Sequence, residues 1–526
     1  MTQLEIQTSY DEVPYDSQPF PQSHPDRLAT LGRLFGLSPV SVTRCRVLEL
    51  GSASGGNLIP MAYHLPESEF IGIDLSRRQV ERGSKAIGDL GLKNVRLQHR
   101  SILDVDHSWG LFDYIICHGV YSWVADEIQE HILAVCSQNL APQGVAYVSY
   151  NTYPGWHMRE MIRHMMRYHA NRFVDTTERI EQARALIDFL SSSVPTENSY
   201  YGMLLKDELE LIKRCKDSYL FHEHLEEINA PIYFHQFMER CRRHGLQYLA
   251  EADFSTMLTS GFPAVVADTL RRISRHIVYT EQYMDFLRNR LFRQTLLCHE
   301  GLPLKRELGA EDVKPFRFAS SVIPAGESVD LRPGRKGSFR TARGAMADTD
   351  YPVTKAAFLV LGECWPRAID LPTLYDNARA LLDPTAIATQ DGNEATRVLA
   401  EDLLKSYTGN VVEFHTWQGD FVTEVTDRPA VSELAAYQAR GGGHMVNQRH
   451  EVVPLDPVAR QLVSVMDGSR NRDGLVRHLV ERVRDGTLTV HQDGNPITDS
   501  AQIENSLRAV MDQVLPKLAR AALLVG

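Results

Sequence analysis

The residues best suited to chemistry lie in one short stretch behind an apolar segment. Residues 47–50 are Val-Leu-Glu-Leu, which has the length and character of a buried parallel strand. Six small residues follow, and Asn57 then opens a segment with apolar residues at helical spacing: the six are Gly51, Ser52, Ala53, Ser54, Gly55 and Gly56. Strand, small-residue turn and helix form the first unit of a doubly wound nucleotide-binding sheet. Glycines let the backbone pass close to a ligand, and free N–H groups at the helix start can bind it.

Two carboxylates narrow the choice of ligand. Glu49 stands directly before the turn, where its charge would repel a pyrophosphate, and the glycine spacing departs from the dinucleotide pattern G-x-G-x-x-G. Asp74 ends a second predicted strand, about 20 residues after the glycines, where an acid commonly binds a ribose hydroxyl. A cationic ligand with a ribose and no phosphate suits both acids, and S-adenosylmethionine (SAM) is such a ligand. The alternative, an ordinary α/β turn with a surface acid, explains neither the position of Glu49 nor the spacing to Asp74.

Alternation of short apolar runs with helical segments predicts an α/β fold of the doubly wound type. The predicted strands are 46–50, 69–75, 95–99, 112–117 and 144–150. Such alternation gives a parallel sheet, whose ligands bind at the carboxyl ends of the strands. Further cofactor contacts are therefore expected from residues at those ends, namely Leu75, Ser101, Ile102 and His118.

Aromatic residues gather after the fourth and fifth predicted strands. Tyr121 and Trp123 follow the fourth strand, and Tyr153 and Trp156 follow the fifth. An aromatic wall attracts a sulfonium or an ammonium through cation–π interaction. Each tryptophan on its own is equally well explained as an anchor for helix packing. Two such clusters at matching strand ends favour a pocket.

Length, charge and cysteine content limit the kinds of protein that this sequence can encode. A chain of 526 residues is too long for one core and predicts about three domains. The net charge of −11 argues against a general nucleic-acid binder. Seven scattered cysteines without a C-x-x-C pair indicate reduced thiols and a cytoplasmic protein. We expect no metal site, no signal peptide and no membrane insertion, because ligand clusters, a basic start and long apolar runs are missing from the sequence.

Changes in composition and in the spacing of apolar residues along the chain predict six parts. They are a Pro- and aromatic-rich cap (1–40), a SAM-binding core (41–156), a helical insertion (157–230), a segment completing the sheet (231–302), a middle winged-helix-like domain (303–440) and a C-terminal helical or winged-helix-like domain (441–526). The first part, with Tyr10, Tyr15 and Phe20, either covers the site or anchors to the surface. The insertion is either the surface of a homodimer or an internal packing layer. Middle and C-terminal parts carry no obvious nucleophile, so protein contact suits them better than DNA contact.

Four motifs together resemble those of a known family. They are Tyr-Asp-Glu-Val-Pro-Tyr (10–15), Leu-Glu-Leu-Gly-Ser-Ala-Ser-Gly-Gly-Asn-Leu-Ile-Pro (48–60), His-Gly-Val-Tyr-Ser-Trp (118–123) and Tyr-Asn-Thr-Tyr-Pro-Gly-Trp (150–156). The set resembles class I SAM-dependent methyltransferases, and more specifically bacterial proteins with a methyltransferase regulatory domain, which include rickettsial protein lysine methyltransferases. This resemblance implies SAM as cofactor and lysine side chains of a protein as one acceptor. A small-molecule methyltransferase and a non-catalytic SAM-binding scaffold remain alternatives, whereas Glu49 and the glycine spacing disfavour an NAD-dependent oxidoreductase.

Roles for the candidate residues follow from this interpretation. Glu49 and Gly51 would hold the amino-acid end of SAM, with Ala53, Gly55, Gly56 and Asn57 completing the turn, and Asp74 would hold the ribose. Adenine would lie against backbone groups near Ser101 and against Ile102. The acceptor channel would be lined by aromatic residues, with Tyr10, Tyr15, Tyr121 and Trp123 close to the reaction and Tyr153 and Trp156 binding the substrate. His118 either carries a proton away or bonds a backbone carbonyl, and we favour the carbonyl. Ala53 replaces a glycine common in such enzymes and should fit if its φ is negative.

Overall fold

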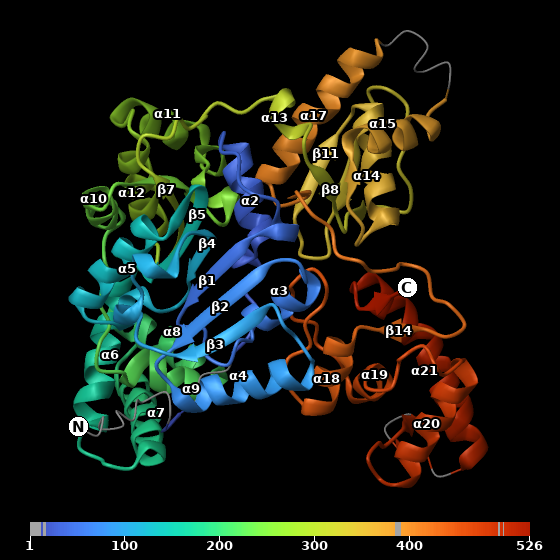
Figure 1. Ribbon diagram of the computed structural model, residues 1–526, viewed down its shortest axis with the longest axis horizontal. Helices are drawn as coiled ribbons and strands as arrows, with labels where there is room; N and C mark the ends of the chain where they lie inside the picture. Colours follow the sequence, from blue (N-terminus) through green and yellow to red (C-terminus); the bar gives the residue numbers. More distant parts are fainter. Residues whose placement is uncertain (1–11, 14–16, 384–390, 493–494, 498) are drawn as a thin grey trace.

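A seven-stranded sheet organises the first 300 residues of the computed structural model (Figure 1). The structure describes residues 12–13, 17–383, 391–492, 495–497 and 499–526. The strand order is β3-β2-β1-β4-β5-β7-β6. The strands are β1 (Arg46–Leu50), β2 (Glu69–Asp74), β3 (Val95–His99), β4 (Phe112–Cys117), β5 (Leu140–Asn151), β6 (Leu246–Glu251) and β7 (Phe292–His299). The first five strands run parallel, as predicted, whereas β7 is antiparallel to both of its neighbours.

Helices cover both faces of this sheet, as expected for a doubly wound fold. They are α2 (Pro25–Leu34), α3 (Leu58–His64), α4 (Arg77–Asp89), α5 (Asp126–Gln138), α10 (Phe234–Arg243), α11 (Ala264–Ile273) and α12 (Ile277–Arg288). The start of α4 shows how the sequence places them. The hydroxyl of Ser76 accepts a hydrogen bond from the Gln79 N–H group, which caps the helix directly after β2. The helix therefore begins at the edge of the sheet where Asp74 lies.

The predicted helical insertion lies between β5 and β6. It consists of α6 (Trp156–Ala170), α7 (Thr176–Ser193), α8 (Tyr200–Arg214) and α9 (Asp217–Leu220). These helices bury a small core of their own, which includes Ile162, Ile187 and Leu205. In Figure 1 the bundle stands below the sheet, next to the N-terminal end of the described chain. An internal packing layer therefore accounts for part of its apolar surface.

The middle part continues the core of the sheet. Its elements are α13 (Ala310–Val313), β8 (Arg317–Ala319), β9 (Ile323–Pro324), β10 (Gly337–Arg340), β11 (Met346–Thr349), α14 (Pro352–Cys364), β12 (Ile369–Asp370), α15 (Leu371–Ala380), α17 (Gly392–Thr408) and β13 (Glu413–His415). The sequence of this part predicts a strand pair over 411–415 and 421–425, as in a winged helix, but residues 421–425 are not a strand. Instead β13 pairs with β8 from the start of the same part. One buried cluster extends from Leu28 to Phe414, so no break in the core accompanies the predicted boundary at residue 303.

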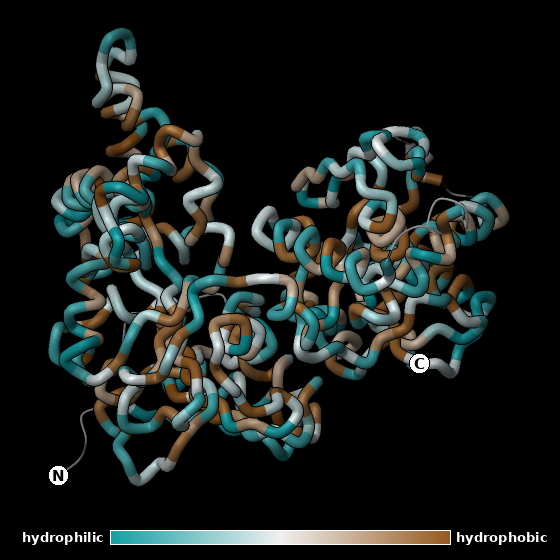
Figure 2. The backbone as a smooth tube through the Cα atoms, turned by 90° about the horizontal axis from the view of Figure 1, so that it is seen from above, coloured by the Kyte–Doolittle hydropathy of each residue, from teal (hydrophilic) through white to brown (hydrophobic). Residues whose placement is uncertain are grey.

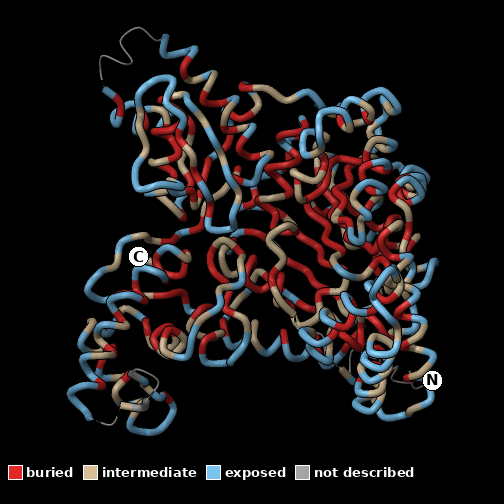
Figure 3. Tube along the Cα trace, turned by 180° about the vertical axis from the view of Figure 1, so that it is seen from behind, coloured by how far each residue is buried: buried red, intermediate tan, exposed pale blue. Residues whose placement is uncertain are grey.

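The C-terminal part has a separate core. It comprises β14 (Ala430–Val431), α18 (Glu433–Gly441), α19 (Pro457–Val463), α20 (Arg472–Arg484), β15 (His491–Gln492), β16 (Asn495–Pro496), α21 (Ser500–Arg520) and β17 (Leu524–Val525). Val431 and Ala435 pack in this core, so it begins before the predicted boundary at residue 441, which is the end of α18. Figure 2 shows a larger part with the N-terminus joined to a second part with the C-terminus. Figure 3 shows the sheet as a buried layer and the outer C-terminal helices as mainly exposed. Among the described residues, no helix combines the length and apolarity needed to cross a bilayer.

Candidate active site

Glu49 is a buried carboxylate with one oxygen left for a ligand. It lies at the end of β1 and is 3% exposed. One carboxylate oxygen, Oε1, accepts a hydrogen bond of 2.7 Å from Nδ2 of Asn57. The other, Oε2, is buried and has no hydrogen-bond partner among the described residues. Burial raises the pKa of Glu49 to about 7, and the hydrogen bond from Asn57 opposes that rise.

Backbone hydrogen bonds to β2 hold the turn after Glu49. Gly51 and Ser52 both donate to the carbonyl of Ile73 on β2, at 2.9 Å each. Gly51 has a φ of +78°, and a Cβ there would come within 2.4 Å of a methyl group of Val120. The N–H groups of Gly51 and Ser52 therefore already have a partner in the neighbouring strand. The turn therefore contributes a close, side-chain-free surface next to Glu49.

Asp74 clamps the same turn from the end of β2. Its Oδ2 accepts a hydrogen bond of 2.7 Å from the Ala53 N–H group, and its Oδ1 accepts one of 2.8 Å from Ser76. Ala53 has a φ of +46°, so the condition that we set for an alanine to fit here, a negative φ, is not met. The clamp from Asp74 supports this left-handed conformation, which otherwise favours glycine. Beyond it, Leu75 is 49% exposed at the rim of the sheet.

Ser101 and Ile102 stand at the carboxyl end of β3 and are half-buried. Asp104 folds back and accepts a hydrogen bond of 3.0 Å from the Ser101 N–H group. The Ser101 hydroxyl in turn accepts one from Leu103. We expected the backbone near Ser101 to contact adenine, and its N–H group is instead bonded to Asp104. The spacing S-x-x-D of a capping box was the signal that identifies this arrangement.

His118 begins the loop after β4 and stacks among aromatic rings. Its Nδ1 lies 2.8 Å from the hydroxyl oxygen of Tyr147, so this ring atom meets a side chain and not the backbone carbonyl that we favoured. Its ring centroid is 3.6 Å from that of Phe20 and 6.2 Å from that of Phe292. Desolvation lowers the pKa of His118 to about 3, so the imidazole is neutral at pH 7 and is a weak base. Sequence reasoning missed Phe292, because it comes from β7, 174 positions after His118 in the chain.

The N-terminal arm lies across the glycine turn. The Ser17 hydroxyl accepts a hydrogen bond of 2.7 Å from the Gly56 N–H group. A Cβ on Gly56 would come within 2.5 Å of the Ser17 carbonyl, so only glycine allows this approach. Phe20 then donates from its N–H group to Oδ1 of Asn57 at 2.9 Å. Residues 17–20 therefore cover the site, whereas Tyr10 and Tyr15 lie outside the described residues.

Three of the predicted aromatic residues differ in their surroundings from a channel wall. Tyr121 is fully buried, with its ring 5.2 Å from that of Phe237. Trp156 is 1% exposed and meets Trp123 edge-on at 6.3 Å. Packing of α6 and α10 against the end of the sheet buries these rings, so Tyr121 and Trp156 anchor helices. Trp123 is half-buried, with the guanidinium of Arg163 6.0 Å from its ring.

Tyr153 belongs to a partly exposed aromatic group beside the site. Its ring stacks on His157 with 4.0 Å between centroids and lies 5.2 Å from that of Tyr233. Its hydroxyl donates a hydrogen bond of 3.0 Å to Glu160. His157 and Tyr233 were not predicted, because they come from two separate helices that meet only in the folded chain.

The residues around Glu49 fit the amino-acid end of SAM. An unpaired, buried carboxylate oxygen is costly unless a ligand supplies a donor. The ammonium of SAM is a cationic donor of that kind, and the glycine surface beside it admits a close ligand. Among the described residues, no three His, Cys, Asp or Glu side chains converge as metal ligands would.

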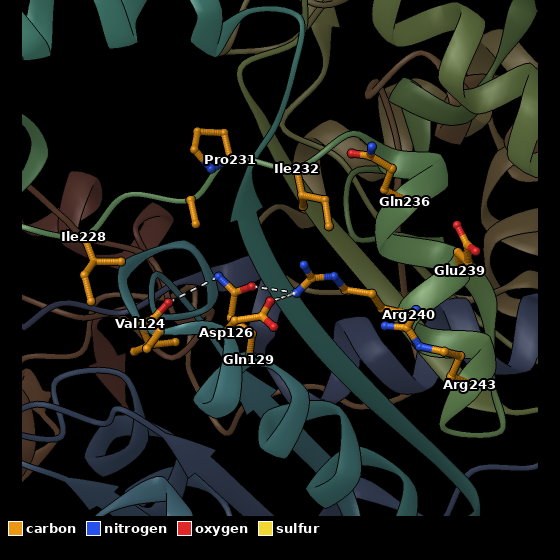
Figure 4. A pocket seen from close by; sticks show the side chains of 12 residues that line it. Val124, Asp126, Gln129, Ile228, Pro231, Ile232, Gln236, Glu239, Arg240 and Arg243 are labelled. Atoms are coloured by element: carbon orange, nitrogen blue, oxygen red, sulfur yellow. Dashed lines mark hydrogen bonds and ion pairs between the residues drawn. The ribbon is translucent and has the colours of Figure 1, made fainter.

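A hollow of about 530 Å³ lies outside this site, between α5 and α10 (Figure 4). The guanidinium of Arg240 spans it, bonding Asp126 at 2.7 Å and Gln129 at 2.9 Å. Gln129 in turn donates to the carbonyl groups of Tyr121 and Val124. These bonds hold the segment after β4, and therefore the loop that begins with His118, against α10.

Comparison with known proteins agrees with this geometry. Family models match residues 41–204 as a "Methyltransferase domain", 216–299 as a "Predicted methyltransferase regulatory domain" and 427–523 as a "PKMT, C-terminal winged helix domain". The uncharacterised protein RP789 of Rickettsia prowazekii (strain Madrid E) is 37% identical over 523 residues, covering 98% of this chain and 93% of its own. The solved structure of PKMT2 from Rickettsia typhi in complex with AdoHcy is 33% identical, with a TM-score of 0.87, over 98% of this chain and all of that one. The chain belongs to the PKMT family of methyltransferases.

As a member of this family, the protein is a SAM-dependent methyltransferase with SAM as its cofactor. A second Rickettsia prowazekii protein, RP028, is 44% identical over 241 residues, which is 46% of this chain and 96% of that protein. The match of a winged-helix model to residues 427–523 also agrees with the separate C-terminal core that begins near Val431.

Proposed function

We propose that this methyltransferase N-methylates lysine side chains of a protein substrate by direct, in-line transfer. The observation that carries the proposal is the match to PKMT2 of Rickettsia typhi, at 33% identity over 98% of this chain. A match of this extent includes the regulatory and C-terminal parts as well as the SAM-binding sheet. A small-molecule acceptor is the second candidate, since many methyltransferases share the sheet alone.

The chemistry requires alignment and a dry site more than a strong base. SAM supplies a methyl group already activated by its sulfonium. The chain must hold the lysine amine in line and exclude water. Phe20 and Phe292, on either side of His118, provide apolar surface that lowers the pKa of an entering lysine through desolvation. With its pKa near 3, His118 is neutral and positions the acceptor, while the lysine loses its proton to solvent on entry.

An exposed apolar surface next to the site suits a protein substrate. Tyr283 and Phe286 on α12 are 38% and 46% exposed, and Phe292 at the start of β7 is 39% exposed. The ring of Phe286 meets Tyr233 at 6.1 Å, which continues the surface to Tyr153. Phe292 links the same surface to His118. A folded partner or a loop can lie across these rings with one lysine reaching His118.

The acceptor class is tested by methyl transfer from labelled SAM to lysate proteins and, in parallel, to a metabolite extract. We expect label on lysine residues, identified by mass spectrometry of digested proteins. Replacing both Tyr283 and Phe286 by Ser should raise the KM for a protein substrate by roughly 30-fold, since each substitution loses an apolar contact of about 1 kcal/mol. AdoHcy binding should not change. Val265→Ser, on a 75% exposed side chain of α11, is the matched control. Label only in the metabolite fraction would refute the proposal.

The helical insertion supports a homodimer as part of the same proposal. Large apolar residues on it face solvent: Val174 is 97%, Tyr168 82%, Phe189 63% and Tyr200 61% exposed. Large apolar side chains exposed in this way are consistent with a protein interface. We expect light scattering to give twice the mass of one chain, and Phe189→Lys to shift the protein toward the monomer. A monomeric wild-type protein at micromolar concentration would contradict a dimer.

A further inference from the structure

The C-terminal part reaches the SAM site through one histidine. His450 lies in a turn after α18, closed by a bridge between Val446 and Val452. It is 3% exposed and has a φ of +61°. Its Nε2 is 2.8 Å from Oδ1 of Asn57, a residue 393 positions earlier in the chain. Asn57 is the partner of Glu49, so two hydrogen bonds separate His450 from the carboxylate proposed to bind SAM.

The partners of Asn57 determine the direction of each hydrogen bond. The Phe20 N–H group can only donate, so the Asn57 atom that it meets is the carbonyl oxygen Oδ1. The amide nitrogen Nδ2 then faces Glu49, which accepts. Since Oδ1 accepts from His450 as well, the Nε2 atom of His450 carries its hydrogen. The hydrogen bond from His450 to the amide oxygen of Asn57 therefore helps to keep the amide nitrogen directed at Glu49.

A polar interface holds His450 in place. Asp26 on α2 accepts hydrogen bonds from the N–H groups of Thr416 and Trp417, at 2.7 and 2.9 Å. His24 lies between Trp417 and His450, with ring centroids at 5.7 and 5.1 Å. A cavity of about 80 Å³ is lined by residues of all three segments, 21–27, 413–421 and 448–451. Next to His450, the guanidinium of Arg449 binds the carboxylate of Glu413.

We propose that His450 is a positioning residue for SAM, and that the C-terminal winged-helix domain thereby forms part of the cofactor site. The Phe20 N–H group and the Ser23 hydroxyl also bond the Asn57 amide, so loss of the bond from His450 loosens this amide and leaves Glu49 with a less firmly positioned donor. The unpaired oxygen Oε2 of Glu49 is then less well positioned to accept a hydrogen bond from SAM. The domain acts on cofactor affinity as well as on any protein contact. This inference rests on SAM binding and is independent of the identity of the methyl acceptor.

The test compares His450→Asn with His450→Gln. A Gln side chain can place its amide N–H where Nε2 of His lies, whereas the Asn amide is too short and reaches only the place of Nδ1. Asn also tolerates a left-handed backbone better than Gln, so backbone strain cannot explain a weaker Asn variant. Calorimetry with SAM and with AdoHcy should show an increase in Kd of about tenfold for His450→Asn, the size of one buried hydrogen bond. His450→Gln should stay within about threefold of wild type.

A neighbouring contact serves as control. Arg343→Ala breaks the ion pair between Arg343 and Glu451, beside His450, without touching Asn57. Its Kd for AdoHcy should equal that of wild type. Thermal unfolding without ligand shows whether each variant is folded. Unchanged affinity in a folded His450→Asn protein would overturn the proposal, as would equal weakening in folded Asn and Gln variants. Binding is measured without an acceptor, so failure of the lysine proposal leaves this test intact.

Discussion

Glu49→Gln should weaken SAM binding by roughly 10- to 100-fold, the range expected for loss of a hydrogen bond to a charged group. Gln still accepts the hydrogen bond from Asn57, so the shape of the site is kept. What is lost is the negative charge on the unpaired oxygen Oε2. Calorimetry with SAM and AdoHcy measures the change. Glu67→Gln, at an exposed position where the carboxylate pairs with Arg44, is the matched control and should bind SAM as wild type does.

The pH dependence of binding follows from the same carboxylate. Burial raises the pKa of Glu49 to about 7 in the free protein, so below that pH the group is mainly protonated and neutral. SAM affinity should fall as pH decreases from 7 toward 5.5, and binding there should release a proton. The folded pKa lies above the unfolded value, so ionisation of Glu49 costs stability as pH rises through 7. Glu49→Gln removes that cost, so the ligand-free variant should be no less stable at pH 8. A flat affinity profile in the wild-type protein would contradict this role.

Arg293→Met should lower the free energy of unfolding by about 3–5 kcal/mol, the cost of breaking a buried ion pair from one side. Arg293 is fully buried and bonds Glu251 at 2.6 Å, Glu281 at 3.0 Å and Asp285 at 2.8 Å. Without it, three buried carboxylates face each other, and Arg290 still pairs with Asp285 at 3.4 Å. Burial already raises the pKa of Glu281 to about 7. Removing Arg293 takes away a cation that lowers this pKa, so the variant should lose stability as pH rises from about 4.5 through 7, where Glu281 ionises in the unfolded chain before it does in the folded one.

A matched exposed pair separates this effect from the general cost of removing an arginine. Arg271→Met breaks an ion pair with Asp268 in which both side chains are more than half exposed, so it should cost less than about 1 kcal/mol. Thermal and denaturant unfolding of both variants measure the difference. If Arg293→Met and Arg271→Met had equal free energies of unfolding, the buried cluster between β6, β7 and α12 would add no more stability than an exposed ion pair. Hydrogen bonds connect the cluster to β5, because the Thr295 hydroxyl bonds both Glu251 and the hydroxyl of Tyr150 on that strand.

Local patterns in the sequence were enough to predict that Glu49, the glycine turn and Asp74 lie together, whereas their contacts with SAM stay predictions. Glu49, the glycine turn and Asp74 lie within 30 residues, and each follows a strand that its own apolar run predicts. The five parallel strands, the helical insertion and the SAM-dependent class could therefore be predicted. The φ of Ala53 could not, because the bond from Asp74 that supports it depends on how β2 lies against β1. The roles of Asp74 toward ribose and of Ile102 toward adenine stay predictions.

By itself the sequence determined the strand–turn–helix unit, the acids at its edge and the family, because these depend on residues close together along the chain. Only the tertiary structure decided which distant groups surround that unit. Phe20 and Phe292 meet at His118, and His450 reaches Asn57 across 393 positions. The same packing buried Tyr121 and Trp156 as anchors, although their types suited a channel. Aromatic and polar side chains of the same type serve either purpose, and the choice depends on which surfaces the fold brings against them.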